Sequence, residues 1–148
     1  MKRRTPSRTA QRGFTLLEVM VVLVIIGILA SIVAPNLIGS RDTANVQKAV
    51  TDISGLESAL GMFYIHNNRF PTTDQGLEAL VTRPNSGPEP RNYQEGGYIQ
   101  RLPTDPWGNA YSLVSPGERS RYDLCSAGPD MQLGTEDDIC NYNLGDFQ

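Results

Sequence analysis

The most constraining feature of this sequence is one long apolar stretch placed almost at its beginning. The stretch begins at Phe14 and ends at Ile38, and Glu18 is its only charged residue. A transmembrane helix needs about 20 predominantly apolar residues. The residues before the stretch are basic and polar, and positively charged flanks stay on the cytoplasmic side of a membrane. We therefore predict a single-pass protein with a cytoplasmic N-terminus and an external C-terminal part.

The length and charge of the chain limit its other functions. A chain of 148 residues has room for one membrane segment and one small globular domain. Five of the 13 basic residues lie in the first 13 positions, so without that segment eight basic residues would accompany 16 acidic ones, a net charge of -8. Binding to phosphates needs clustered Lys and Arg. Nucleic acid is therefore not an expected partner.

No sequence pattern indicates catalysis. The single histidine, His66, has no partner at metal-ligand spacing, and two cysteines are too few for a multi-cysteine zinc site. The chain has no Gly-x-Ser-x-Gly, P-loop or His-Glu-x-x-His pattern. A tethered calcium-dependent hydrolase would need a base and a nucleophile in one cleft, which the sequence does not offer. We predict that the protein is not an enzyme.

The helix is expected to continue beyond the membrane segment with a different pattern. Apolar residues recur every three or four positions, which predicts one buried helix face. They are Val46, Val50, Ile53, Leu56, Leu60, Phe63 and Tyr64. The Asn-Asn pair after His66 and the proline that follows indicate the end of the helix. One helix from Phe14 to about His66 is therefore predicted.

The remaining residues are rich in Pro and Gly and predict short elements. We expect a short helix near residues 74–80 and an irregular connection over residues 82–98. Residues 111–114 and 121–124 flank a Pro-Gly turn signal and predict a hairpin. The apolar face of the hairpin would pack on the helix. The predicted fold class is α+β, with a long N-terminal helix packed on a small C-terminal antiparallel sheet.

The junction between the basic segment and the apolar stretch has an unusual order. An ordinary secretory signal loses its apolar region together with the leader. Here Gly13 follows the basic residues and precedes the apolar stretch. Cleavage after Gly13 would therefore leave the apolar helix on the mature chain, beginning at Phe14. An uncleaved single-pass helix is the alternative that composition alone favours.

Residues 12–18 (RGFTLLE) resemble the processing motif of type IV pilins and pseudopilins. In that family a prepilin peptidase cuts after the glycine and methylates the new N-terminal phenylalanine. The resemblance implies a cleaved leader (residues 1–13), a transmembrane and filament-core helix (residues 14–40) and a periplasmic head (residues 41–148) that includes the second half of the long helix. It also implies a type IV pilin-like fold and a helical filament assembled from the inner membrane.

Three further segments resemble the major pseudopilins of type II secretion systems, the general secretion pathway protein G family. They are residues 69–80 (RFPTTDQGLEAL), 102–109 (LPTDPWGN) and 122–130 (YDLCSAGPD). The sequence departs from the family pattern over residues 82–95, at Met131 and at its two cysteines.

This second resemblance implies a function and a set of partners. The chain would be the major structural subunit of the pseudopilus, which polymerises from the inner membrane and drives folded proteins through the outer-membrane channel. Its partners would be further copies of itself, minor pseudopilins, the prepilin peptidase and the inner-membrane assembly platform. The alternative is a type IV pilin used for adhesion, motility or DNA uptake.

Acidic residues gather near the C-terminus in a window without any basic residue, residues 127–138. Most acidic runs are solvated turns, and the spacing here does not match an EF-hand. The resemblance implies a calcium site, with side-chain ligands and further oxygens from Ala127, Asp130, Gln132, Thr135, Asp137 and Asp138. Met131 stands where the family has a glycine, and methionine does not readily adopt a positive φ.

Two other features carry hypotheses of their own. Glu18 is a carboxylate within an apolar helix, where charge is costly, and we expect it to pair with the free amine of Phe14 on a neighbouring subunit. A snorkelling side chain is the alternative. Cys125 and Cys140 would lie in an oxidising periplasm, which favours a disulfide over free thiols.

The order of leader, Gly13 and apolar helix generates the first testable prediction. In cells with an active prepilin peptidase, the membrane-extracted protein should lack residues 1–13 and carry one methyl group on Phe14. Intact-mass measurement decides the question. A protein that still carries residues 1–13 in such cells would contradict the prediction.

Overall fold

The computed structural model describes residues 14–147, except for the side chains of residues 32–40. The predicted leader with Gly13 therefore lies outside the described residues. The chain divides into two compact units, Met1–Ser40 and Arg41–Gln148. The helix α1, Leu16–Asn67, runs through both sequence ranges, and the other elements all belong to the second unit.

The first turn of α1 is capped by a side chain. The backbone N–H of Glu18 donates to Oγ1 of Thr15 at 3.2 Å, so Thr15 is the N-cap residue. A Thr followed three residues later by Glu is the sequence pattern of a capping box. This pattern is a signal for the helix start that our sequence reading missed.

In the first unit, the apolar residues from Leu16 to Leu29 are all exposed. Leu17 is 72% and Leu23 is 62% accessible, for example. Among the residues that the structure describes, no helix is long and apolar enough to cross a membrane. The transmembrane segment over residues 14–40 stays a prediction.

In the second unit, the predicted apolar stripe of α1 forms the core. Ile53, Leu60 and Phe63 are completely buried, and Val50 and Leu56 nearly so. The stripe was wrong at Tyr64, which is 36% exposed and stacks on Phe70 with ring centroids 4.8 Å apart. Tyr64 therefore lies at the edge of the stripe, about 100° around the helix from Phe63.

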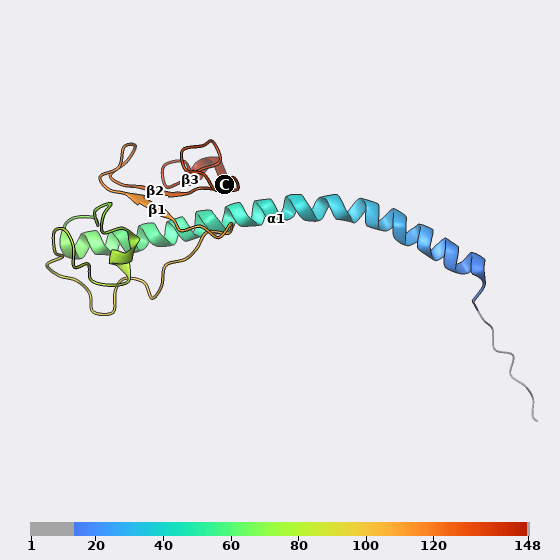
Figure 1. The fold of residues 1–148 in the computed structure, drawn as a ribbon, viewed down its shortest axis with the longest axis horizontal. Helices are drawn as coiled ribbons and strands as arrows, with labels where there is room; N and C mark the ends of the chain where they lie inside the picture. Colours follow the sequence, from blue (N-terminus) through green and yellow to red (C-terminus); the bar gives the residue numbers. More distant parts are fainter. Residues whose placement is uncertain (1–13, 148) are drawn as a thin grey trace, which may run out of the picture. The chain divides into compact units, whose positions relative to one another are not determined.

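Three short strands pack against this stripe. The strands β1 (Ser112–Val114), β2 (Asp123–Ser126) and β3 (Ile139–Cys140) form an antiparallel sheet in the order β1-β2-β3. Figure 1 shows the sheet running alongside the C-terminal half of α1. Leu113 pairs with Leu124, and both side chains lie in the same core cluster as the helix stripe.

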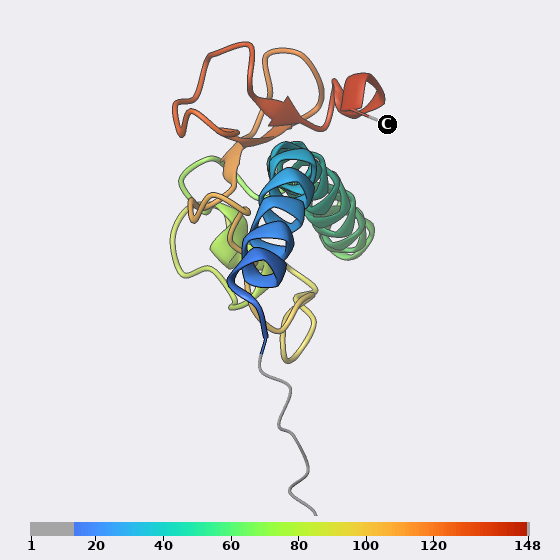
Figure 2. The same cartoon turned by 90° about the vertical axis from the view of Figure 1, so that its right-hand side faces the viewer.

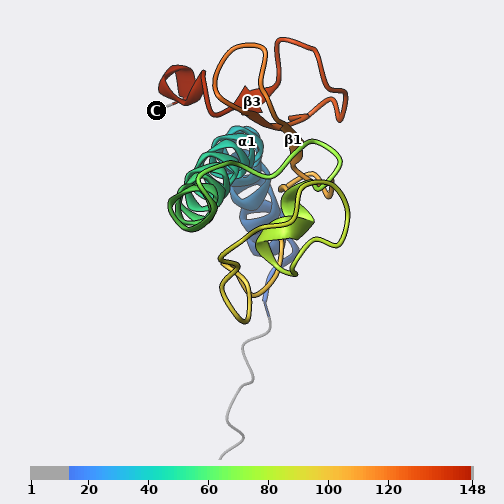
Figure 3. The same ribbon diagram turned by 90° about the vertical axis from the view of Figure 1, so that its left-hand side faces the viewer.

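The predicted hairpin is confirmed, with its second strand shifted two residues towards the C-terminus. The third strand, β3, was not predicted, because two residues carry no alternating pattern of their own. Viewed from the C-terminal end of α1, the sheet and the segment before it cover different sides of the helix (Figure 3).

Two tyrosines join the region of the sheet to the polar flank of α1. The hydroxyl of Tyr111 donates to Oδ2 of Asp52 at 2.8 Å, and that of Tyr122 lies 3.4 Å from Oε1 of Glu57. Burial and the neighbouring Glu57 raise the pKa of Tyr122 to about 12. Burial and the hydrogen bond to Asp52 likewise raise the pKa of Tyr111. Both phenols therefore stay protonated and remain donors.

The segment between α1 and the sheet has little regular structure. The short helix expected near residues 74–80 is a single 3-10 turn, η1 (Leu77–Leu80), and residues 81–98 form no helix or strand. The side chain of Gln75 is buried and holds this connection by donating to the carbonyl groups of Ser86 at 2.7 Å and Pro88 at 3.0 Å. In this segment, side-chain hydrogen bonds thus take the place of the backbone hydrogen bonds of a regular helix or sheet.

The C-terminal 3-10 turn, η2 (Leu144–Phe147), lies on the same side of α1 as the sheet (Figure 2). The side chain of Gln47 donates to the carbonyl oxygen of Phe147 at 2.8 Å. The end of the chain is thereby fixed to α1.

The turn before β2 is organised by one buried carboxylate, Asp123. It accepts backbone N–H groups from Glu118 at 2.7 Å, Arg119 at 3.2 Å and Ser120 at 3.0 Å. Burial opposes ionisation of Asp123, but these three bonds and the hydroxyl of Ser120 outweigh burial and lower its pKa below the ordinary value of 3.8. The ionised form is therefore the one that the fold stabilises.

A pH dependence of stability follows from Asp123. Its depressed pKa contributes stability that is present above the unfolded pKa, near 4, and is lost as pH falls through the lower folded value. Asp123→Asn should reduce the free energy of unfolding at pH 7 by about 1–3 kcal/mol. Its difference from the unchanged protein should shrink below pH 4.

Urea unfolding of the full chain in detergent between pH 2 and pH 7 measures both effects. Asp146→Asn is the control, because Asp146 is an exposed carboxylate. A difference between Asp123→Asn and the unchanged protein that stays constant down to pH 2 would contradict this account.

Candidate calcium-binding loop

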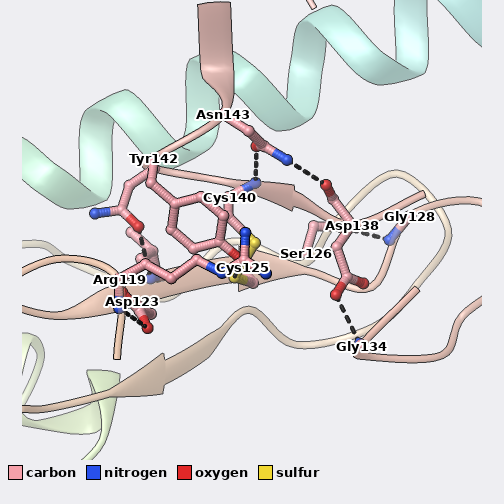
Figure 4. The surroundings of a disulfide bond; sticks show 12 residues. Arg119, Asp123, Cys125, Ser126, Gly128, Gly134, Asp138, Cys140, Tyr142 and Asn143 are labelled. Atoms are coloured by element: carbon pink, nitrogen blue, oxygen red, sulfur yellow. Dashed lines mark hydrogen bonds between the residues drawn. A yellow bond between two sulfur atoms is a disulfide. The ribbon is translucent and has the colours of Figure 1, made fainter. Parts of the chain in front are cut away.

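The acidic segment forms a loop whose two ends are held side by side. It connects β2 to β3, and Cys125 lies opposite Cys140 across these strands. A disulfide joins the two cysteines, with Cα atoms 4.1 Å apart. Figure 4 shows the disulfide at the base of the loop, with the ring of Tyr142 beside it. The carboxylates of the loop are thus presented from a cross-linked base.

The base of the loop also contains a close backbone contact at Gly128. This residue has φ 64°, and a Cβ atom there would lie 2.2 Å from the carbonyl oxygen of Asp137. Only glycine fits such a contact without displacement of the backbone. Residues 128 and 137 are therefore packed together, and the part of the loop between them projects outward.

A buried polar chain supports the first residues of the loop. The backbone N–H of Gly128 donates to Oγ of Ser126 at 3.2 Å, and this hydroxyl donates to Oδ2 of Asp105 at 2.7 Å. Both Ser126 and Asp105 are buried. The other oxygen of Asp105 accepts the N–H groups of Trp107 at 3.1 Å and Asn109 at 2.6 Å. Asp105 therefore connects the Asp-Pro-Trp-Gly-Asn turn to the loop.

Sequence reasoning missed the role of Asp105. The available signal was an Asp at the start of a turn rich in Pro, Gly and Asn, where its side chain bonds to the backbone that follows. Trp107 of the same turn is partly buried and packs against the core.

The last predicted ligand, Asp138, accepts hydrogen bonds through both its side chain and its backbone. Its Oδ2 accepts the N–H of Gly134 at 2.6 Å. Its backbone oxygen accepts Nδ2 of Asn143 at 2.9 Å, and Oδ1 of Asn143 accepts the N–H of Cys140 at 2.7 Å. Asn143 therefore ties Asp138 to the disulfide-bonded strand.

One oxygen of Asp138 is unusual. Its Oδ1 atom is buried and has no hydrogen-bond partner among the described residues. Leaving a buried carboxylate oxygen unpaired is costly. A hard cation is one group that such an oxygen binds well. The donor chemistry of the loop thus fits a calcium ion.

The other predicted ligands do not converge in this conformation. Oδ1 of Asp130 accepts the N–H of Gln132 at 2.9 Å, and the carbonyl oxygen of Gln132 accepts the hydroxyl of Thr135 at 3.2 Å. Asp137 is exposed. Within the described residues, no three Asp, Glu, His or Cys side chains lie close enough to hold a metal ion. The calcium site stays a prediction.

The backbone at Met131 has a conformation that is unusual for a methionine. Its φ is 59°, in the left-handed region that disfavours methionine. Its side chain is 60% exposed, so no core packing is lost when the backbone turns there. The turn geometry of the loop is therefore kept without glycine at this position.

A hollow of about 650 Å³ lies beside Asp138. Its wall contains Arg119, whose guanidinium carbon lies 4.9 Å from the ring centroid of Tyr142. The two side chains of this cation–π contact lie beside the disulfide (Figure 4). Gly134, Thr135 and Glu136 of the loop also line the hollow.

The second group of predicted site residues lies in the first unit. Phe14 is 83% accessible, and Glu18 is exposed as well. The carboxylate of Glu18 makes no hydrogen bond or ion pair with any described residue of its own chain. Its side chain is therefore available to a partner outside the chain.

The fold as a whole is that of pilin-like filament subunits, in which a long N-terminal helix packs on a small antiparallel sheet. A solved structure supports this class. The chain is similar to the major pseudopilin from the type 2 secretion system of enterohaemorrhagic Escherichia coli, with a TM-score of 0.69 and 54% sequence identity. The match covers 74% of this chain and 96% of that one.

Family comparisons then specify the class. Residues 36–142 match the family "Type II secretion system (T2SS), protein G", and residues 8–34 match the prokaryotic N-terminal methylation motif. The chain is 61% identical to the type II secretion system core protein G of Aeromonas hydrophila, over 93% of this chain and 96% of that protein. The corresponding protein of Escherichia coli K12 is also 61% identical, over 90% and 92%. The chain belongs to the type II secretion system protein G family.

Proposed function

We propose that this chain is the major structural subunit of a type II secretion pseudopilus, which polymerises from the inner membrane and drives folded proteins through the outer-membrane channel. The observation that carries the proposal is the presence in one chain of the methylation motif and, directly after it, the protein G match. A filament subunit of this kind needs no catalytic site.

The exposed apolar helix gives the proposal a physical basis. The described apolar side chains from Leu16 to Leu29 are all accessible in the single chain. A continuous apolar surface of this kind marks contact with lipid or with other protein. Before assembly, the inner membrane would cover it, with the N-terminus cytoplasmic and the head periplasmic. After assembly, the helices of other copies would cover it.

Processing fits the same sequence of events. Cleavage between Gly13 and Phe14 by the prepilin peptidase would remove five positive charges and create a new amine at the start of the helix. The inner-membrane assembly platform would then add the subunit below minor pseudopilins. Glu18 lies four residues after Phe14, so an axial offset between neighbours would bring its carboxylate to the amine of the next copy.

A substitution at Glu18 tests the function and its assembly step together. In a strain that lacks its own major pseudopilin, the unchanged chain should restore secretion of folded proteins. Glu18→Ala should insert into the membrane and be cleaved but should form no filaments and restore no secretion, because the pair with the amine is lost. Immunoblots, filament microscopy and exoprotein assays measure these steps.

Ser31→Ala is a matched control, since Ser31 lies on the same helix and its hydroxyl donates to the carbonyl oxygen of Ile28 in that helix. Normal filaments from Glu18→Ala would refute the role of Glu18. Loss of surface pili with intact secretion, on deletion of the gene for this chain from its own host, would favour the type IV pilin alternative.

We also propose that the head binds a structural calcium ion in the loop of residues 127–138. The side chains of Asp130, Asp137 and Asp138 would bind it, with oxygens of Ala127, Gln132 and Thr135 completing the shell. The unpaired buried oxygen of Asp138 supports this proposal. The ion would offset repulsion among the carboxylates and hold the loop against the sheet.

Thermal unfolding tests the calcium proposal. Calcium chloride should raise the melting temperature of the full chain in detergent, and chelator should lower it, because a ligand that binds only the folded state stabilises it. Asp130→Ala or Asp137→Ala should remove the difference. Asp146→Ala, an exposed carboxylate outside the loop, should keep it. Equal melting temperatures of the unchanged chain with and without calcium would contradict the calcium site.

A further inference from the structure

We propose that the Cys125–Cys140 disulfide is a positioning element for the calcium site, so that disulfide formation and calcium binding strengthen one another. This inference rests on the proposed calcium site. It concerns the geometry of the loop ends, which the structure gives directly, and it assigns the disulfide a role beyond general stability.

The disulfide lies next to the two ends of the loop, which are fixed by hydrogen bonds. Cys140 is two residues after Asp138, and Asn143 bonds to both residues. On the opposite strand, Cys125 is two residues before Ala127, and Ser126 between them is fixed by Asp105. The cross-link therefore sets the separation of the first and last predicted ligands, Ala127 and Asp138.

The part of the loop that must move lies between these fixed ends. Residues 131–137 are all exposed, and the three aspartates are not gathered in this conformation. Binding of a cation must therefore reorganise the middle of the loop around Asp138. The entropic cost of closing a loop falls when its ends are already held together, so a cross-linked base lowers the cost of forming the site.

Without the disulfide, the backbone pairing between the two strands at the base would be short. The strand β3 has only two residues, and its pairing with β2 consists of two residue pairs. Repulsion among the carboxylates would act to open this short ladder. We therefore expect the reduced loop to populate open states that bind calcium poorly.

Coupling between two binding events is reciprocal. If the disulfide favours calcium binding, calcium must favour the disulfide by the same factor. Coupling between sites is typically about 5- to 150-fold, and each cysteine lies two residues from an end of the loop. The expected result is at least about a fivefold change in each direction.

The first experiment measures calcium affinity in both redox states. The full chain in detergent is titrated with calcium chloride by calorimetry, before and after reduction by dithiothreitol. In the reduction, one dithiothreitol gives two electrons and two protons to the disulfide and closes to its cyclic disulfide, which leaves thiols on Cys125 and Cys140. Affinity should fall at least about fivefold on reduction, return on reoxidation, and be equally low in the double variant Cys125→Ser and Cys140→Ser.

The second experiment measures the reverse effect. The chain is equilibrated in mixtures of reduced and oxidised dithiothreitol with calcium or with chelator, and thiols are counted by alkylation and mass spectrometry. Calcium should shift the midpoint towards more reducing mixtures by at least about fivefold in the ratio. Asp130→Asn, which keeps both cysteines, should remove this shift.

The outcomes of these experiments separate the coupling from the calcium site and from the pseudopilus role. Equal calcium affinity in both redox states would overturn the coupling and leave the calcium site intact. No binding in either state would overturn the calcium site and the coupling together, without affecting the pseudopilus role. Loss of the near-ultraviolet circular dichroism of the head on reduction would also overturn the inference, because the disulfide would then support the whole fold.

Discussion

Burial of one face of α1 is the interaction on which the rest of the head depends. Leu113 of β1, Leu124 of β2 and Ile139 of β3 all lie in one cluster with the helix stripe. Full burial of one such side chain contributes about 1.5–3 kcal/mol, and strands of two to four residues are not stable alone. The sheet therefore exists because α1 supplies the surface that it covers.

Side-chain hydrogen bonds determine the rest of the head, because little of it has regular structure. Asp123 organises the turn before β2, Gln75 holds the irregular connection, and Asp105 links a tight turn to the acidic loop. All three side chains are buried. An apolar residue of similar size at any of them would leave backbone groups unpaired, which costs more than a lost surface contact.

These two kinds of interaction explain which features were predictable from the sequence. The helix, its buried stripe and the hairpin depend on local periodicity, and all were predicted apart from Tyr64 and small shifts of their ends. The strand β3 and the bond from Ser126 to Asp105 depend on residues distant in the sequence, so no local pattern indicated them. The family was predictable because residues 12–18 resemble a processing motif and residues 69–80, 102–109 and 122–130 resemble protein G segments, and such motifs are recognised from the sequence without knowledge of the fold. The proposed calcium ligands do not converge in this conformation, so their arrangement would depend on a bound ion.

The acidic loop shows how the two kinds of interaction combine. Burial of Ile139 holds the end of the loop on the core, while Asn143 and the disulfide fix Asp138 beside it. The side chains of residues 131–137 are all exposed, and Glu136 and Asp137 repel one another. The middle of the loop is thus the part of the head that burial stabilises least. A cation bound there would complete a surface that neighbouring subunits can contact in one fixed shape.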